Sequence, residues 1–443
     1  MSNALSKKFN VISLMKFTAP TIIMMLFMSL YTMIDGVFVS RFVGTGALSA
    51  VNIVYPVLNV VVAIAIMLAT GASAVVAKKM GEGKIAEARD NFTLITVIGA
   101  VVGVIFGVIS IIFIHPMLKM LGTSDAIYEY CYQYSFILSV FTPMAILQML
   151  FQYFFVTAGK PMLGLAATIA GGCANMVLDY IFIVPLNMGI AGAALATGIG
   201  FSIPAVCGLF YFAVHRKGTM YFVMPHFDKK AIFDSCTNGS SEMVTNLSMA
   251  ITTFLFNIIM MKYLGEDGVA AITVVLYSQF LLTAVYLGYS SGVAPILSYN
   301  YGSGNTAQLK KLFKMSIIFL AVSSVVLFAA ALLLSGHIVG IFSKPDTNVF
   351  VIAKNGFGLF SISYLFIGFN IFSSGMFTAL SNGKVSAIIS FLRTFAFLVV
   401  SILLLPQIMD INGIWLAVPL AEILALFVSV IYMVKLRKVY GYA

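Results

Sequence analysis

Residues 52–77 read NIVYPVLNVVVAIAIMLATGASAVVA and contain no charged residue. A helix needs about 20 apolar residues to cross a bilayer, because its backbone polar groups must be satisfied within the segment itself. This stretch therefore predicts a transmembrane helix. Further predominantly apolar stretches lie before and after it, at residues 14–39, 92–114, 131–156, 162–184, 188–214, 239–261, 270–299, 313–334, 356–380, 386–405 and 412–434. The sequence thus predicts an all-α polytopic membrane protein with twelve transmembrane helices.

The composition agrees with this fold class, since 61% of the 443 residues are hydrophobic and 9% are charged. A soluble domain carries about 25% charged residues. A net charge of +10 could indicate a nucleic-acid partner, but the distribution of the basic residues indicates membrane topology instead. With the N-terminus placed in the cytoplasm, 19 of the 25 Lys and Arg residues fall in loops on that side and 5 in loops on the other. The positive-inside rule then predicts a multi-pass protein of the inner (plasma) membrane, with both termini cytoplasmic and no nucleic-acid partner.

An internal duplication relates the two halves of the chain. A shift of 221 residues places RFVGTGALSAVN (41–52) on KYLGEDGVAAIT (262–273), and it also places Gly81 on Gly302. The same shift still holds near residue 192, so the match is not a local coincidence. Because each half contains six spans, the two copies have the same orientation in the membrane, as in transporters built from parallel repeats.

The duplication predicts two pseudo-symmetric six-helix bundles around a central cleft. We expect an N-terminal lobe at residues 1–214, a cytoplasmic linker at 215–238 and a C-terminal lobe at 239–443. Rocking one bundle against the other would open the cleft alternately to each side of the membrane, which is typical of transporters.

Two acidic residues of the first half lie inside predicted spans. Asp35 lies six residues before Arg41 and Asp179 six residues before Pro185, each near the outer end of its span, which puts them at the same depth. Tyr31 and Asn175 lie one helical turn before them, on the same faces. The first half has no Lys or Arg inside a span, and burial without a cation favours a protonated carboxyl group. The pair can therefore hold a proton near neutral pH; the alternative is that each Asp caps a broken helix or bonds to a neighbour.

The predicted spans of the second half contain Glu242, Arg393 and Glu422. Arg393 and Glu422 both fall near the middle of the membrane. We therefore predict a structural ion pair between these two residues, rather than a contact with substrate. Glu242 falls at the start of the seventh span, near the cytoplasmic interface, where the helix dipole favours an acid.

The sequence resembles the multidrug and toxic compound extrusion (MATE) family over essentially the whole chain. The resemblance rests on the two-fold six-helix layout, on Pro20 and Asp35 in the first span, on the Asn175-x-x-x-Asp179 pair, and on the GKP turn (159–161) and the GAALAT run (192–197). It implies an antiporter that exports organic, often cationic, compounds in exchange for H⁺ or Na⁺, with no catalytic residues and no cofactor. A proton is the expected coupling ion, and Na⁺ is the alternative.

The resemblance also implies roles for individual residues. The coupling ion is expected at Tyr31, Asp35, Asn175, Asp179 and Thr197, and a sodium ion would be held by Asp35, Asn175, Asp179 and Thr197. The substrate cavity is expected to include Gln152, Met28 and Pro20. Residues 357–380, in the tenth span, contain no Asp or Glu, so the sodium site that some relatives have in the C-terminal lobe is not matched.

A flippase for lipid-linked precursors, from the same superfamily, is the alternative transport function. Its cleft would need several basic residues for a pyrophosphate group, whereas the predicted spans contain only Arg393. A membrane-embedded enzyme is disfavoured, because the sequence has no H-E-x-x-H motif and its four histidines fall in loops or at helix ends. We expect a monomeric, non-enzymatic protein whose partners are small organic substrates and membrane lipids.

Overall fold

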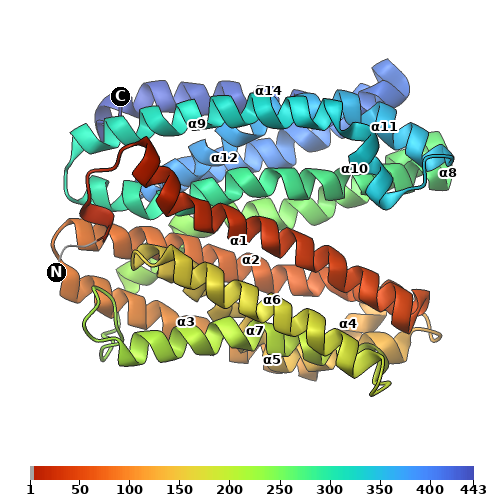
Figure 1. The fold of residues 1–443 in the computed structure, drawn as a ribbon, viewed down its shortest axis with the longest axis horizontal. Coiled ribbons are helices and arrows are strands. Elements are labelled where there is room, and N and C mark those ends of the chain that lie inside the picture. The colour runs from red at the N-terminus through yellow and green to blue at the C-terminus, as the bar shows by residue number, and fades with distance from the viewer. Residues whose placement is uncertain (1–3) are drawn as a thin grey trace.

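The computed structural model describes residues 4–443, apart from the side chains at positions 37, 40 and 45, and it consists of helices joined by short turns (Figure 1). The α-helices are α1 (Val11–Phe38), α2 (Thr45–Gly81), α3 (Ile85–Ile112), α4 (Ile114–Met120), α5 (Tyr128–Thr157), α6 (Pro161–Ile183), α7 (Gly189–Val214), α8 (Lys229–Gly302), α9 (Thr306–Leu333), α10 (Ser335–Phe342), α11 (Asn348–Phe360), α12 (Tyr364–Ala379), α13 (Gly383–Phe391) and α14 (Leu398–Tyr440). Short 3-10 helices lie at Ala4–Ser6 and Ser361–Ser363, and π-helical turns lie at Val39–Val43 and Leu392–Phe397. No strand occurs within residues 4–443, so the predicted all-α class is confirmed.

Ten continuous helical runs among the described residues are long and apolar enough to cross a membrane. Two of them are long enough for two crossings, and each is broken by one residue with a positive φ: α8 at Gly265 (φ 63°), and α14 at Asp410 (φ 50°). Each break separates two spans, which gives the twelve transmembrane helices predicted from the sequence. The 221-residue shift pairs these breaks with Gly44 (φ 119°) and Gly189 (φ 57°), so the duplicated turns share their backbone conformation.

The helices of the two halves form two groups. In Figure 1, α2 to α7 (orange to green) lie in the lower part of the view and α9 to α14 (cyan to blue) in the upper part. Contact between the groups is made by α1 and α8, since α1 packs on both α6 and α8, and α8 packs most extensively on α2. The first turn of α1 and the last turn of α14 lie at the same end of the bundle, on the left in Figure 1.

The segment between the halves is shorter than predicted. α8 begins at Lys229, because the Asp228 side chain accepts hydrogen bonds from the backbone N–H groups of Lys230 (2.9 Å) and Ala231 (3.1 Å) and so caps the helix. Residues 229–238 of the predicted linker 215–238 are therefore helical, and that part of the prediction was wrong. The charged residues that suggested a loop form the exposed first turns of α8.

The remaining connecting segment, residues 215–228, is fastened to α3. Arg89 Nε donates to the carbonyl oxygen of Thr219 (2.9 Å), and its Nη1 donates to the Tyr221 hydroxyl (2.8 Å). The guanidinium carbon also lies 4.0 Å from the centroid of the Tyr221 ring. Further along, the backbone N–H of His226 donates to Asp90 Oδ1 (2.8 Å). The connecting segment is thus held by the first half of the chain.

Glycines bring the ends of α2 and α8 into backbone contact. A Cβ atom added at Gly81 would lie 2.0 Å from the carbonyl oxygen of Tyr299, and one added at Gly302 would lie 2.1 Å from the carbonyl oxygen of Lys78. The 221-residue shift pairs Gly81 with Gly302 and Lys78 with Tyr299. The two contacts are therefore copies of each other, and the duplication is visible in the packing between the halves.

A second pair of glycines continues this contact further into the bundle. A Cβ atom at Gly71 would lie 1.8 Å from the Ser235 carbonyl oxygen, and one at Gly239 would lie 1.8 Å from the Met67 carbonyl oxygen. Small residues allow such close approach between membrane helices. We call Gly71, Gly81, Gly239 and Gly302 the glycine seam. It holds the two halves together at the end of the bundle where α2 ends.

Candidate functional site

Asp35 and Asp179 face each other inside the first half of the chain. Asp179, on α6, is 0% exposed, and Asp35 lies one turn before the end of α1. Their carboxyl groups interact directly and are within hydrogen-bonding reach of each other when one is protonated. As two ionised groups, however, Asp35 Oδ1 and both Asp179 oxygens find no hydrogen-bond donor among the described residues. The pair therefore needs a proton or a bound cation to be stable.

The end of α6 adds to this demand. Asp179 lies four residues before the end of α6 at Ile183, whereas the helical run that carries Asp35 continues through the π-helical turn to Val43. The carboxyl end of a helix carries a partial negative charge, which disfavours an ionised acid nearby. The ion pairs found among residues 4–443 involve neither of these two aspartates. Nothing in this part of the chain therefore compensates a double negative charge.

A narrow pocket lies one turn from Asp179 along α6 and has a volume of about 20 Å³, enough for about one water molecule. Tyr31, Asn175 and Thr197 all line it. Asn175 Nδ2 donates to Thr197 Oγ1 over a long 3.5 Å, while Asn175 Oδ1 is buried and has no partner among the described residues. Tyr31 also interacts electrostatically with Asp35. The structure thus gathers all five residues predicted for the coupling ion around one place.

Small residues on α6 make this gathering possible. A Cβ atom at Gly172 would lie 2.5 Å from the Phe27 ring, so only glycine lets α1 approach α6 here. A Cβ atom at Gly171 would lie 2.6 Å from the Gly200 carbonyl oxygen, which brings α7 with Thr197 equally close. The sequence therefore places glycines at the points where three helices must converge.

The three residues predicted for the substrate cavity do not lie together. Gln152 lines the same pocket; its Nε2 donates to Thr168 Oγ1 (3.2 Å), and its Oε1 is buried without a partner in the described part of the chain. Pro20, buried in α1, and Met28, half-buried on α1, are not among the residues lining it. Gln152 therefore lies at the same pocket as Tyr31, Asn175 and Thr197, and the other two do not line it.

Sequence reasoning missed several polar residues at this site. Tyr134, on α5, is 4% exposed and interacts electrostatically with both Asp35 and Asp179. Gln148 and Thr168 line the pocket with Gln152. Gln148 lies one turn before Gln152, and this pair of amides in an apolar span was a usable signal. Tyr134 belongs to no motif, because its proximity to the aspartates arises only from helix packing.

The comparisons with known proteins identify the chain. The family model described as MatE matches residues 20–181 and, a second time, residues 243–403. The chain belongs to the MATE family. The resemblance seen in the sequence is thereby confirmed, and the double match agrees with the internal duplication.

Relatives of this MATE protein match it over nearly its full length. The multidrug export protein MepA of Staphylococcus haemolyticus (strain JCSC1435) is 23% identical over 427 residues, covering 96% of this chain and 93% of that protein. A crystal structure of MATE in the straight conformation has a TM-score of 0.94 at 20% identity and covers 100% of both chains. An outward-facing conformation of a multidrug resistance MATE family transporter has a TM-score of 0.92 at 20% identity, covering 99% of this chain and 98% of that one. The predicted fold is confirmed by these structures.

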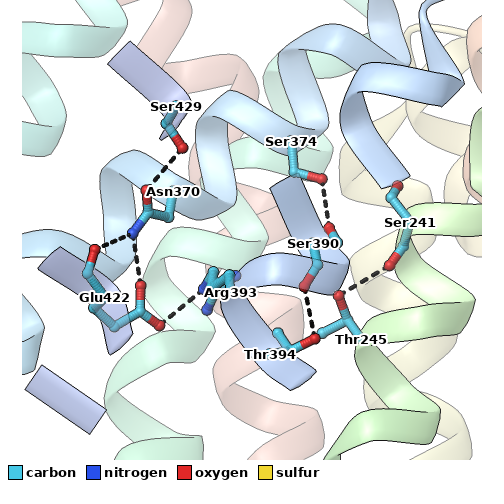
Figure 2. A network of polar contacts seen from close by, with 9 residues as sticks. All are labelled: Ser241, Thr245, Asn370, Ser374, Ser390, Arg393, Thr394, Glu422 and Ser429. Atoms are coloured by element: carbon cyan, nitrogen blue, oxygen red, sulfur yellow. Dashed lines mark hydrogen bonds and ion pairs between the residues drawn. The ribbon is translucent and has the colours of Figure 1, made fainter. Parts of the chain in front are cut away.

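The second half of the MATE protein holds a polar network of a different kind (Figure 2). Arg393 Nε donates to Glu422 Oε1 at 2.8 Å, with side chains only 12% and 6% exposed. Asn370 Nδ2 donates to Glu422 Oε2 (2.8 Å), and Ser429 Oγ donates to Asn370 Oδ1 (2.9 Å). Both carboxylate oxygens are therefore satisfied, in contrast to those of Asp35 and Asp179, and the network ties α12 and the second span of α14 to the π-helical turn Leu392–Phe397.

Glu242 does not lie where the sequence suggested. α8 starts at Lys229 with Asp228 as its cap, so Glu242 is well inside the helix and the interpretation as a helix-start acid was wrong. Its carboxylate interacts electrostatically with Arg393 and also with Tyr153, on α5 of the first half. Glu242 therefore lies where the two halves of the MATE protein face each other.

Proposed function

We propose that this MATE-family protein is an antiporter that exports organic, often cationic, compounds in exchange for an ion moving inward. The single observation that carries the proposal is the pair Asp35 and Asp179, of which three buried carboxylate oxygens have no donor among the described residues. A structural role would be served by satisfied groups, as at Arg393 and Glu422. A pair left unsatisfied instead requires a ligand that comes and goes, which is what an exchanger needs. The match to multidrug export proteins over 96% of the chain agrees with export as the direction.

A proton is the coupling ion that we propose. Protonation of one aspartate removes the repulsion and lets that carboxyl donate to the other, so the pair binds a proton without further ligands. A proton entering from outside would then repack α1, which carries Asp35 and Tyr31 as well as Pro20. A proline inside a helix leaves one backbone carbonyl unpaired, so α1 can bend there at lower cost. The movement would release the exported compound.

Sodium is the second candidate, and one observation favours it. Asn175 Oδ1 is buried without a partner, and Thr197 Oγ1 lies beside it. Together with the carboxylates these oxygens form the kind of donor set that a small hard cation prefers. A sodium ion would use the Thr197 oxygen as a ligand, whereas a proton held by the two aspartates would not. Transport by variants of Thr197 therefore distinguishes the two ions.

Alternating access would move the lobes 1–214 and 239–443 against each other. The glycine seam closes the end of the bundle that carries the lysine excess, which we propose to be cytoplasmic, with the protein acting as a monomer in the plasma membrane. The described state would then be closed to the cytoplasm. We do not favour lipid-linked precursor transport, because Arg393 is already paired with Glu422 at 2.8 Å and is not free for a pyrophosphate.

Transport by purified protein in liposomes tests the proposal. Efflux of a cationic dye driven by a pH gradient without Na⁺ is expected in the parent protein and should be lost in Asp35→Asn and in Asp179→Asn. Asp234→Asn is the matched control, because Asp234 lies at the end of the bundle far from the pair, among residues lining a different cleft. Size-exclusion profiles establish that each variant folds. The proposal is wrong if a folded variant of either aspartate transports at the parent rate under the proton gradient.

A further inference from the structure

A large cleft opens between the two halves at the lysine-rich end of the bundle. It has a volume of about 600 Å³ and is lined by the end of α2, the start of α8 and the turn between α12 and α13. Its walls therefore come from both halves of the chain. Its basic residues are Lys78, Lys79, Lys84, Lys230 and Lys384, and its acidic residues are Glu82, Asp228 and Asp234.

Most of the acids in this cleft are already engaged. Glu82 pairs with Lys84 at 3.1 Å, and Asp228 accepts two backbone hydrogen bonds as the cap of α8. Lys79 pairs with Glu87, which lies outside the cleft lining. Glu82 is thus neutralised by its own ion pair, whereas Asp228 keeps its negative charge, since its hydrogen-bond donors are neutral backbone groups.

Three lysines remain after these pairings. Lys230 and Lys384 have no ion pair within residues 4–443, and Lys78 lies over the Tyr301 ring at 5.2 Å. The acids of the cleft lining that have no ion pair among the described residues are Asp228 and Asp234, so the three lysines still outnumber them. The cleft therefore offers an excess of positive charge that comes from both halves, Lys78 from the first and Lys230 and Lys384 from the second.

Ser381 adds a second feature that points to a ligand. It lines the cleft with φ 59°, a left-handed conformation in which an L side chain is strained. The equivalent turn of the first half, after α5, has Gly159 there (φ 72°). The Ser381 hydroxyl oxygen is buried and has no partner in the described part of the chain. The wall of this basic cleft therefore contains a serine with a strained backbone and a hydroxyl that has no hydrogen-bond partner among the described residues.

We propose that this cleft binds the phosphate group of an anionic phospholipid, held by Lys78, Lys230, Lys384 and the Ser381 hydroxyl. Phosphate oxygens accept from ammonium and hydroxyl donors, and basic pockets between membrane helices at the cytoplasmic surface bind such headgroups. Anionic headgroups are concentrated at the cytoplasmic surface of the membrane, so the lipid is favoured over a soluble phosphate. The inference goes beyond export and uses the proposed function only for the side of the membrane.

Binding here would affect the closed state directly. Because the lysines come from both halves, a bound headgroup would bridge them and stabilise the state in which the glycine seam is formed. Opening at this end would separate Lys78 from Lys230 and Lys384 and weaken the site. Anionic lipid would thereby favour the state that is closed at this end.

The test measures binding by the full-length protein in detergent, without transport, so that its failure leaves the export proposal untouched. Native mass spectrometry and thermal unfolding compare added phosphatidylglycerol, phosphatidylcholine and inorganic phosphate. We expect phosphatidylglycerol to bind more tightly than phosphatidylcholine and to raise the unfolding temperature. The double variant Lys230→Gln/Lys384→Gln should lose about thirtyfold in affinity for phosphatidylglycerol, from about 1 kcal/mol for each lysine.

Matched variants distinguish lipid binding at this cleft from a non-specific effect of the protein's positive charge. Lys310→Gln/Lys311→Gln removes two exposed lysines of α9 that do not line the cleft, and it should bind phosphatidylglycerol like the parent. Ser381→Gly relieves the strained φ, so it should unfold at a higher temperature while binding the lipid more weakly. Equal loss in the two double variants, or equal binding of phosphatidylglycerol and phosphatidylcholine, overturns the proposal. Binding of inorganic phosphate alone, with the same dependence on Lys230 and Lys384, would show that the ligand is a soluble phosphate and that the lipid assignment is wrong.

Discussion

Gly81 at the end of α2 and Gly302 at the end of α8 contact each other's helices in the same way: the Cα of each lies against a backbone carbonyl of the other helix. The two contacts are related by the internal duplication, because the 221-residue shift places each glycine on the other. It also gives the closed end of the bundle a simple steric requirement, because any side chain at either position would collide with backbone. Backbone cannot yield as a flexible side chain can, so a larger residue must separate the halves.

Replacing Gly81 or Gly302 by leucine should therefore open this end of the bundle. The native Cys236, half-buried on α8 beside the Ser235 that contacts Gly71, reports the opening through its reaction with a maleimide. We expect its labelling rate to rise about tenfold or more, since a shift of about 1.4 kcal/mol changes the open population tenfold. Peptide mass spectrometry measures the rate, with Cys173 in the same molecule as reference.

Gly358→Leu is the control for this experiment. Gly358 is helical, and a Cβ atom there would meet nothing within 4 Å, so leucine fits without moving a helix. Labelling of Cys236 should stay at the parent rate in that variant. An unchanged rate in the Gly81 and Gly302 variants as well would rule out the glycine seam as the closing contact.

The ion pair between Arg393 and Glu422 should be structural. Arg393→Met leaves a buried carboxylate and Glu422→Gln leaves a buried guanidinium, and each loss of one partner costs about 3–5 kcal/mol. Glutamine can still accept from Asn370, so that hydrogen bond is preserved. The double variant should recover much of the lost stability, as measured by the unfolding temperature in detergent. Simple additivity of the two losses would contradict a direct pairing.

Thr197→Val distinguishes the two coupling ions. Valine keeps the shape of threonine but removes the hydroxyl that contacts Asn175 and donates to the Ala193 carbonyl (3.0 Å). If the ion is a proton held by Asp35 and Asp179, proton-driven efflux should fall by no more than about threefold to tenfold, the effect of one neutral hydrogen bond. A sodium ion would lose a ligand instead. A parent whose efflux requires Na⁺, and a variant in which that Na⁺-driven efflux is lost, would favour sodium over the proton.

Some of these features could be predicted from the sequence and others could not, for physical reasons. Hydrophobic length is a local property, so the twelve spans follow from it even where α8 runs through Gly265 without interruption. Asp35 and Asp179 could be paired because both were acids at one depth with no internal cation. The proximity of Tyr134 to these two aspartates could not be predicted, because it depends on how α5 packs against the other helices. Glu242 was misplaced because the cap that starts its helix, Asp228, lies outside the apolar stretch.

Arg89 should be the residue that fastens the connecting segment 215–228. Arg89→Met removes hydrogen bonds to the Thr219 carbonyl and the Tyr221 hydroxyl, each worth about 1.5–3 kcal/mol when one partner is charged. Local opening then becomes easier, so trypsin should cut at Arg216 or Lys217 about a hundredfold faster or more. The control is Lys311→Met, which removes an exposed basic residue of α9. Equal digestion rates in the parent and the Arg89 variant would mean that the segment is held elsewhere.

Glu242 should set the preference for cationic compounds. Its carboxylate interacts electrostatically with Tyr153 of the first half and Arg393 of the second, and the Arg393 charge is already balanced by Glu422. In its ionised form Glu242 would therefore leave a net negative charge where the halves face each other, and the low dielectric there would strengthen its attraction for a cation. Substitution by glutamine keeps the size and removes the charge. The loss should appear in substrate recognition and not in coupling, which belongs to Asp35 and Asp179.

Efflux from liposomes measures this with two substrates, a permanently cationic dye and an uncharged analogue of similar size. In Glu242→Gln the KM for the cation should rise about tenfold, corresponding to about 1.4 kcal/mol, while the KM for the neutral analogue stays near the parent value. Dependence on the pH gradient should be unchanged for both substrates. Asp234→Asn, which removes an acid of the lysine-rich cleft, should leave both KM values unaltered. If the KM rises equally for both substrates in Glu242→Gln, the carboxylate acts through the structure or through coupling and does not contact the cation.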